Sequence, residues 1–207
     1  EDMYADDDMV ITISHLGYIK RTPLADFRQQ GRGGVGAKAS SARDEDFIEY
    51  VHQANMHSTM MFFTEQGRLY WTKVYELPEG NRQSKGRALQ NMINIQKGDK
   101  VCAFIHVKNL NDMEYVQNHY LIFATKDGLM KKTTLESYSR PRANGIIALG
   151  LREDDRLIRV TLTDGNSQML VASYNGKVVR FPEDTVRPMG RTATGVRAIK
   201  LDEDGQD

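Results

Sequence analysis

Basic side chains recur in this sequence at fixed places relative to glycine. Four short segments each place a Ser or Thr three residues before a glycine, and these glycines are Gly17, Gly67, Gly128 and Gly176. Lysines and arginines follow each of them. Such side chains neutralise phosphate charges and release the counterions around a nucleic acid, which gives affinity without reading bases. The pattern therefore predicts polyanion binding through several equivalent contacts.

Nineteen basic residues in these four regions are predicted to contact DNA phosphates. They are Lys20, Arg21, Arg28, Arg32, Lys38, Arg68, Lys73, Arg82, Lys85, Arg87, Lys131, Lys132, Arg140, Arg142, Lys177, Arg180, Arg187, Arg191 and Arg197. If the regions stack as equivalent units, the pairs that follow each turn would form one continuous rim. These pairs are Lys20/Arg21, Arg68/Lys73, Lys131/Lys132 and Lys177/Arg180.

The charge distribution supports this prediction although the chain, with 28 basic and 28 acidic residues, has no formal net charge. Four windows hold 20 of the basic and 6 of the acidic residues, a net charge of +14. The windows are Ser14–Arg43, Gly67–Arg87, Gly128–Arg142 and Gly176–Arg197. The acidic runs Asp44–Asp46, Glu153–Asp155 and Asp202–Asp204 fall in the connectors between repeats. We expect them away from the rim, where repulsion keeps DNA off the wrong face.

A second glycine follows each turn and defines an internal repeat. Gly36, Gly86, Gly145 and Gly195 lie 19, 19, 17 and 19 residues after the turn glycines. Successive turns are 50, 61 and 48 residues apart, and the polar insertion 108–118 accounts for the long interval. The repeat is therefore about 50 residues long. We expect the second glycines to let backbone amides approach phosphates.

The repeat predicts an all-β fold of stacked, propeller-like blades with about four strands each. Asp127-Gly128 and Asn175-Gly176 are dipeptides typical of type I′ hairpin turns. The apolar runs Met60–Phe63, Leu121–Phe123 and Met169–Val171 have the length of strands buried on both faces. Helix is expected only over residues 24–30 and 134–138. We expect residues 1–9 to form an acidic linker from an upstream domain, and residues 10–207 to form a single domain of about four repeats.

Other classes of site are not supported by the residue pattern. Cys102 lies in an apolar run and has no second cysteine to pair with, so it is expected to be buried. The histidines show no ligand-type pairing, and no metal site is predicted. They are His15, His52, His57, His106 and His119. No apolar stretch approaches the ~20 residues of a membrane span. We therefore expect a cytoplasmic protein without a catalytic site in this chain.

Several stretches resemble the C-terminal domain of DNA gyrase A subunits, in the type IIA topoisomerase family. They are Val10–Lys20, Lys73–Pro78, Gly176–Phe181, Val186–Gly190 and Thr194–Arg197. The resemblance implies a β-pinwheel, monomeric when isolated, that wraps duplex DNA and supports ATP-dependent negative supercoiling. It also implies that this domain is part of a gyrase A subunit, and that two A subunits and two gyrase B subunits form an A2B2 enzyme. That enzyme would be located at the nucleoid. ATP and Mg²⁺ would bind elsewhere in that enzyme, and this domain would need no cofactor.

The resemblance extends to the gyrase A box, a heptapeptide of glycines and basic residues that directs wrapping. The matching residues are Gln30, Gly31, Arg32, Gly33, Gly34, Val35 and Gly36, and five of the seven positions agree. Gly31 and Val35 replace basic residues, which weakens the case for full wrapping. The same segment fits the dinucleotide pattern G-x-G-x-x-G, but no strand–helix context surrounds it.

Two alternatives remain open from the sequence. The equivalent domain of the topoisomerase IV A subunit resembles this one and has a degenerate or missing box, so it would position DNA for relaxation or decatenation. A basic propeller that binds proteins is a more distant alternative. Four blades are fewer than the six usual in gyrase, so we expect either a truncated or a naturally shorter domain.

Overall fold

Antiparallel sheet makes up nearly all regular structure in the computed structural model, which describes residues 3–26, 46–81 and 83–201. The strands are β1 (Asp8–Ser14), β2 (Tyr18–Pro23), β3 (Ile48–Asn55), β4 (Thr59–Thr64), β5 (Arg68–Lys73), β6 (Arg87–Ala88), β7 (Val101–Val107), β8 (Tyr120–Thr125), β9 (Leu129–Thr134), β10 (Ile146–Ile147), β11 (Leu157–Thr163), β12 (Gln168–Ala172), β13 (Val178–Pro182) and β14 (Val196–Arg197). The predicted all-β class is confirmed.

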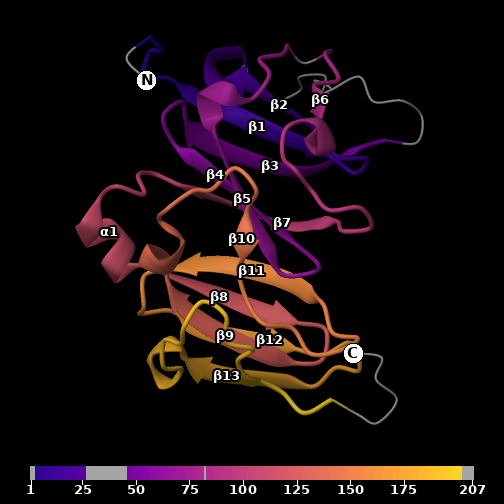
Figure 1. Ribbon diagram of the computed structural model, residues 1–207, viewed down its shortest axis with the longest axis vertical. Coiled ribbons are helices and arrows are strands. Elements are labelled where there is room, and N and C mark those ends of the chain that lie inside the picture. Colours follow the sequence, from indigo (N-terminus) through magenta and orange to yellow (C-terminus); the bar gives the residue numbers. More distant parts are fainter. Residues whose placement is uncertain (1–2, 27–45, 82, 202–207) are drawn as a thin grey trace, which may run out of the picture. The chain divides into compact units, whose positions relative to one another are not determined.

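The strands form three four-stranded sheets and one hairpin (Figure 1). Their orders are β3-β1-β2-β6, β10-β5-β4-β7, β11-β8-β9-β14 and β12-β13. Among the described residues the fourth sheet thus has two strands, fewer than the four expected. The chain divides into two compact units, one of residues 1–60, 72–94 and 106–108 and the other of residues 61–71, 95–105 and 109–207.

Each four-stranded sheet is built from two successive repeats. Its hairpin and one outer strand come from one repeat, whereas the two-residue strand at its other edge follows the second glycine of the next repeat. The glycines Gly86, Gly145 and Gly195, with φ between 69° and 103°, precede β6, β10 and β14. The second glycine therefore marks the point where one repeat joins the sheet of the previous one.

Close approach to that sheet explains the glycine. A Cβ at Gly86 would lie 2.3 Å from the carbonyl oxygen of Ile19, and one at Gly195 would lie 2.3 Å from that of Met130. A side chain is excluded at both positions because the obstacle is backbone. Packing against the preceding repeat is enough to account for the second glycine in the described repeats, and the approach of backbone amides to phosphate stays a prediction.

The hairpin turns differ from the predicted type. In the first turn the amide of Gly17 donates to the Ser14 carbonyl at 2.9 Å, and the Ser14 hydroxyl accepts from the amide of Tyr18 at 3.1 Å. Among the described turn residues only the glycine has positive φ. This is a type I turn followed by a left-handed glycine, so the predicted type I′ turn is wrong. The hydroxyl contact explains why Ser or Thr recurs at this position.

Burial follows the prediction in two of the three apolar runs. Met60–Phe63 are at most 1 % exposed, and residues 121–123 are also buried. Met169–Val171 alternate between half-buried and exposed, and Leu170 is 67 % exposed. The hairpin β12–β13 lies beside the β8–β9–β11 sheet with an incompletely filled gap between them. The fourth sheet is therefore less buried than its sequence predicts.

Helical structure is short. The predicted segments contain 3₁₀ turns at Leu24–Asp26 and Leu135–Tyr138, and further 3₁₀ turns lie at Val74–Glu76, Leu89–Asn91 and Glu183–Thr185. The α-helix α1 (Met113–Asn118) lies in the polar insertion, where no helix was predicted. Its N-terminus is capped by the Asp112 carboxylate, which accepts from the amide of Tyr115 at 3.0 Å. In the part of the chain that the structure describes, no helix has the length and apolarity to cross a membrane.

Candidate nucleic-acid interface

The predicted basic residues that the structure describes divide into buried, half-buried and exposed groups. Lys20, Arg21, Lys131 and Lys132 are each at most 7 % exposed, although strand pairs were expected to line a surface rim. The predicted surface position is wrong for these four residues. Long cationic side chains become buried only when other groups replace their hydration. Their partners explain where they point.

In the first repeat both cations bind the segment that follows β5. The Lys20 Nζ donates to the carbonyl oxygens of Asn81 and Ser84, both at 2.9 Å. The Arg21 Nε donates to the Leu77 carbonyl at 2.8 Å, and its Nη1 lies 2.9 Å from the Glu79 carboxylate. These side chains bind the next repeat and leave no cationic head on the surface.

In the third repeat Lys131 occupies the place of Lys20. Its Nζ donates to the carbonyl of Ala148 at 2.6 Å, the hydroxyl of Tyr138 at 3.2 Å and the carbonyl of Arg191 at 2.5 Å. The same atom lies 4.7 Å from the centre of the Phe123 ring. Burial lowers the pKa of Lys131 to about 7, and the charge of Arg191 contributes to this lowering. Three acceptors match the three donors of an ammonium group and favour that form.

Lys132 forms a buried ion pair with the fourth repeat. Its Nζ lies 3.2 Å from Oε1 of Glu183, whose side chain is fully buried. The same carboxylate accepts from the Thr163 hydroxyl at 2.5 Å and from the Ser167 amide at 3.1 Å. All of these contacts lie within the second compact unit. Lys132 is thus a structural cation.

The second repeat has different chemistry at the equivalent positions. Tyr70 and Trp71 stand where the first and third repeats have paired cations, and the Trp71 Nε1 donates to the Tyr138 carbonyl at 3.1 Å. Arg68 is half-buried and donates from Nη2 to the carbonyl of Asn144 at 2.9 Å. Lys73 is half-buried as well, and its Nζ lies 3.4 Å from the His57 carbonyl. The strand positions therefore do not form a uniform cationic series.

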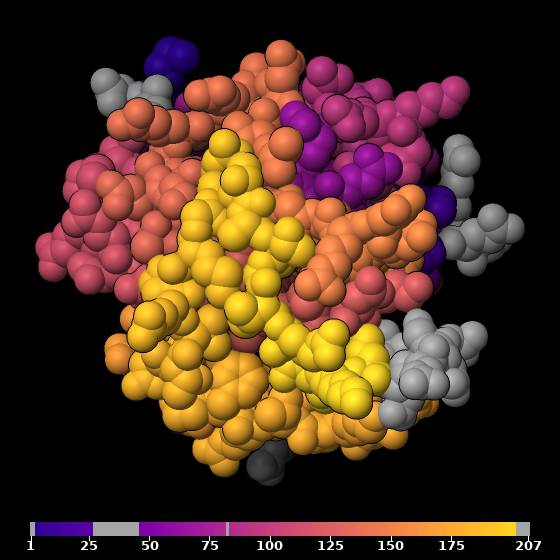
Figure 2. All heavy atoms as spheres, turned by 60° about the horizontal axis from the view of Figure 1, so that its bottom comes forward, coloured from indigo at the N-terminus to yellow at the C-terminus, as the bar shows by residue number. Residues whose placement is uncertain are grey.

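Of the predicted basic residues that the structure describes, eight are exposed, and six of these lie in three segments that we call the basic loops. They are residues 77–88 (without residue 82), 139–147 and 186–197, each running from a 3₁₀ turn through the short strand. Their exposed basic residues are Lys85, Arg87, Arg140, Arg142, Arg187 and Arg197. Arg191 is half-buried and donates to the Ile147 carbonyl. Lys177 and Arg180 lie on the fourth hairpin, and both are exposed. Figure 2 shows the C-terminal part of the described chain, in yellow, at the molecular surface.

Comparison with known proteins identifies the family. The DNA gyrase C-terminal domain family, a beta-propeller family, matches residues 8–55, 58–108, 119–164 and 168–206. The chain belongs to this family. The DNA gyrase A subunit of Haemophilus influenzae is 46% identical over 97% of the chain, and that of Staphylococcus epidermidis is 43% identical over 98%. The chain spans 22% of the length of each of these relatives.

Solved structures have the same fold. The C-terminal domain of DNA topoisomerase IV aligns with a TM-score of 0.77 at 29% identity, covering 97% of this chain and 59% of that one. A DNA gyrase A C-terminal domain aligns with a TM-score of 0.73, covering 95% of this chain and 62% of that one. Its identity is 22%, so this second likeness concerns the fold alone. The propeller architecture is confirmed.

Part of the predicted site lies outside the described residues. This holds for the gyrase A box, Gln30 to Gly36, and for the basic residues Arg28, Arg32, Lys38 and Arg82. Their contribution to DNA binding stays a prediction. Within the described ranges no three His, Cys, Asp or Glu side chains come together in a way that could hold a metal ion.

Acidic residues of the connectors have a structural role that the sequence reasoning missed. One oxygen of Asp46, of Asp99 and of Asp155 accepts from the amide that precedes a turn glycine, at 3.0, 3.1 and 3.0 Å. Burial acts to raise the pKa of Asp46, but hydrogen bonds from the amides of Leu16 and Phe47 and from the Ser14 hydroxyl lower this pKa below its ordinary value. The signal was available, because each Asp lies two residues before the first residue of an outer strand.

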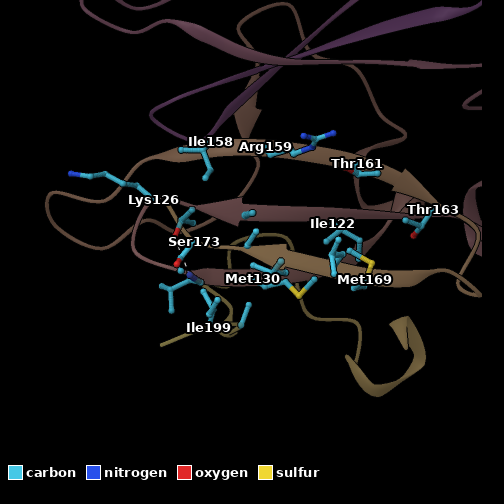
Figure 3. Close-up of a pocket in the computed structure, with 18 of the residues that line it drawn as sticks. Ile122, Lys126, Met130, Ile158, Arg159, Thr161, Thr163, Met169, Ser173 and Ile199 are labelled. Atoms are coloured by element: carbon cyan, nitrogen blue, oxygen red, sulfur yellow. Dashed lines mark hydrogen bonds between the residues drawn. The ribbon is translucent and has the colours of Figure 1, made fainter. Parts of the chain in front are cut away.

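The second compact unit also has a mainly apolar cavity. A cavity of about 720 Å³ lies between the β8–β9–β11 sheet and the hairpin β12–β13. Ile122, Met130, Ile158, Met169 and Ile199 line it, and Figure 3 shows their side chains along the two facing sheets. This lining does not suit phosphate. The exposed basic loops are therefore the candidate DNA surface.

Proposed function

We propose that this chain binds duplex DNA through its basic loops, without reading base sequence, and wraps it. The exposure of the loop cations, beside the burial of the strand cations, supports the proposal most strongly. Exposed guanidinium and ammonium groups can neutralise phosphates, whereas Lys20 or Lys131 would first have to break their bonds to carbonyls. The same loop in each described repeat offers such groups, so the contacts recur once per repeat.

The whole protein is proposed to be a DNA gyrase A subunit. It would act with the B subunit in an A2B2 enzyme that introduces negative supercoils with ATP, in the cytoplasm and at the nucleoid. The relatives that are DNA gyrase A subunits, at 42 to 46% identity, support this role. In this proposal the cleavage chemistry, ATP and Mg²⁺ belong to other parts of the enzyme, and this domain positions DNA.

A second candidate is the A subunit of topoisomerase IV. The positions of Gly31 and Val35, which lack the basic residues of the gyrase A box, favour it. The likeness to a topoisomerase IV domain at 29% identity also fits it. The identity to curated gyrase A subunits, 46% in one case, makes gyrase the better supported choice.

Salt-dependent DNA binding tests the proposed surface. Arg140→Gln/Arg142→Gln removes two exposed charges from one basic loop, and Arg152→Gln/Arg159→Gln removes two exposed arginines outside the loops. Affinity for a 40-base-pair duplex would be measured by fluorescence anisotropy over a range of KCl concentrations. The loop pair should lower the slope of log K against log salt by about 1.8, since each phosphate contact contributes about 0.9. Equal effects of the two pairs would show that net charge alone governs binding.

A further inference from the structure

Two buried lysines connect one repeat to the basic loop of the next. Lys20 in β2 donates to the carbonyls of Asn81 and Ser84, which both belong to the first basic loop. Lys131 in β9 donates to Ala148, directly after the second basic loop, and to Arg191 in the third. Each lysine thus joins backbone positions that are distant in sequence from it.

The fold itself does not require a lysine at this position. The equivalent residue, three after the turn glycine, is Tyr70 in the second repeat and Val179 in the fourth. Among the described residues Lys131 has no carboxylate partner, and the nearby charge of Arg191 is of the same sign. A buried ammonium bound only to neutral acceptors contributes little net stability compared with an apolar side chain. Its geometry points to another role.

We propose that Lys20 and Lys131 are positioning residues for DNA binding, each fixing the backbone of the basic loop in the following repeat. This inference rests on the proposed function, because it assumes that the loops meet DNA. An ordered loop presents its arginines without losing conformational freedom on binding, whereas a free loop loses it at that moment. In this proposal the buried lysine strengthens DNA binding by the exposed loop cations, although it does not contact DNA itself.

Positioning and direct contact give different salt dependence. If Lys131 touched phosphate, its removal would lower the salt slope by about 0.9. If it only orders the loop, the same phosphates are neutralised after binding, and affinity falls at an unchanged slope. Arg187→Gln, which removes an exposed loop charge, supplies the direct-contact reference.

Lys131→Met in the full chain is the test variant, because methionine fills a similar volume without the three donors. Leu121→Ala is the stability control, since Leu121 is fully buried in β8 and lies outside the basic loops. Hydrogen exchange would be followed by mass spectrometry for residues 186–195, and affinity for the 40-base-pair duplex by anisotropy at several KCl concentrations. Lys131→Met should accelerate exchange in that loop and raise the Kd about tenfold at an unchanged slope. Leu121→Ala should do neither.

Three results would overturn the proposal. One is a Lys131→Met chain that keeps wild-type exchange and affinity, and another is a slope lowered as in Arg187→Gln. The third is an equal effect of Leu121→Ala, which would indicate a purely structural role. If the wild-type chain did not bind DNA, the proposed function would fail, and the exchange measurement alone would still decide whether Lys131 orders the loop.

Discussion

The join between repeats can be tested with two glycines of almost identical backbone conformation. Gly17 has φ of 84° and Gly86 has φ of 85°, so alanine meets the same conformational strain at either position, about 1 to 2 kcal/mol. A Cβ at Gly17 has no atom within 4 Å. A Cβ at Gly86 lies 2.3 Å from the Ile19 carbonyl oxygen and 2.8 Å from its carbon.

Gly86→Ala must therefore displace the strand that joins the second repeat to the first. That strand is held by the Tyr18–Ala88 and Ile19–Arg87 pairs and by the Leu89 amide, which donates to the Gly17 carbonyl at 2.9 Å. Disturbing one or two such hydrogen bonds costs about 1 kcal/mol each. We expect Gly86→Ala to lower the free energy of unfolding by about 2 to 4 kcal/mol, and Gly17→Ala by about 1 to 2.

Urea unfolding followed by circular dichroism measures both values. Coincidence with a second probe is required, because a free energy is defined only for a two-state transition. Equal destabilisation by the two variants would refute the reasoning, since it would mean that the close approach at Gly86 is relieved without cost.

Three further predictions concern single side chains. Arg32→Ala should reduce wrapping, read as a linking-number shift, more than binding, with a salt slope lower by about 0.9; unchanged wrapping would remove the gyrase A box from the account. Burial lowers the folded-state pKa of Lys131 to about 7, from 10.5. Between these values the unfolded chain binds more protons, so the free energy of unfolding, relative to Lys131→Met, should rise with pH from 7 to 10.5. A flat difference would contradict this burial. Burial also raises the pKa of Cys102 to about 12, so a disulfide reagent at about pH 8 should label it far more slowly in the native than in the urea-unfolded chain.

The repeat and the fold class could be predicted because they depend on local chemistry. In the first and third repeats the Ser or Thr three residues before the turn glycine forms the same two contacts. Its carbonyl accepts from the glycine amide, and its hydroxyl accepts from the amide of the next residue. Such contacts leave a fixed spacing in the sequence. The turn type was predicted wrongly, because Asp-Gly and Asn-Gly occur both in type I′ turns and in type I turns that end in a left-handed glycine.

The site was predicted only in part, because the sequence shows that a side chain is charged but not which group in the fold it binds. Lys131 and Arg142 look alike in sequence, yet Lys131 binds the carbonyls of Ala148 in its own repeat and of Arg191 in the next, and Arg142 is exposed. Successive side chains of a strand point to opposite faces of the sheet, and which face is buried depends on the repeat that packs against it. The role of the second glycine as the join between repeats was hidden for the same reason.

Chiral wrapping of DNA is the central claim and can be read from plasmid topology. The chain would be added in increasing amounts to a relaxed circular plasmid, the topology closed with a nicking-closing enzyme, and the linking number read on a gel. We predict a shift of one sign that grows with protein and is reduced in Arg140→Gln/Arg142→Gln. A chain that binds the plasmid at the same concentrations and leaves the linking number unchanged would contradict wrapping.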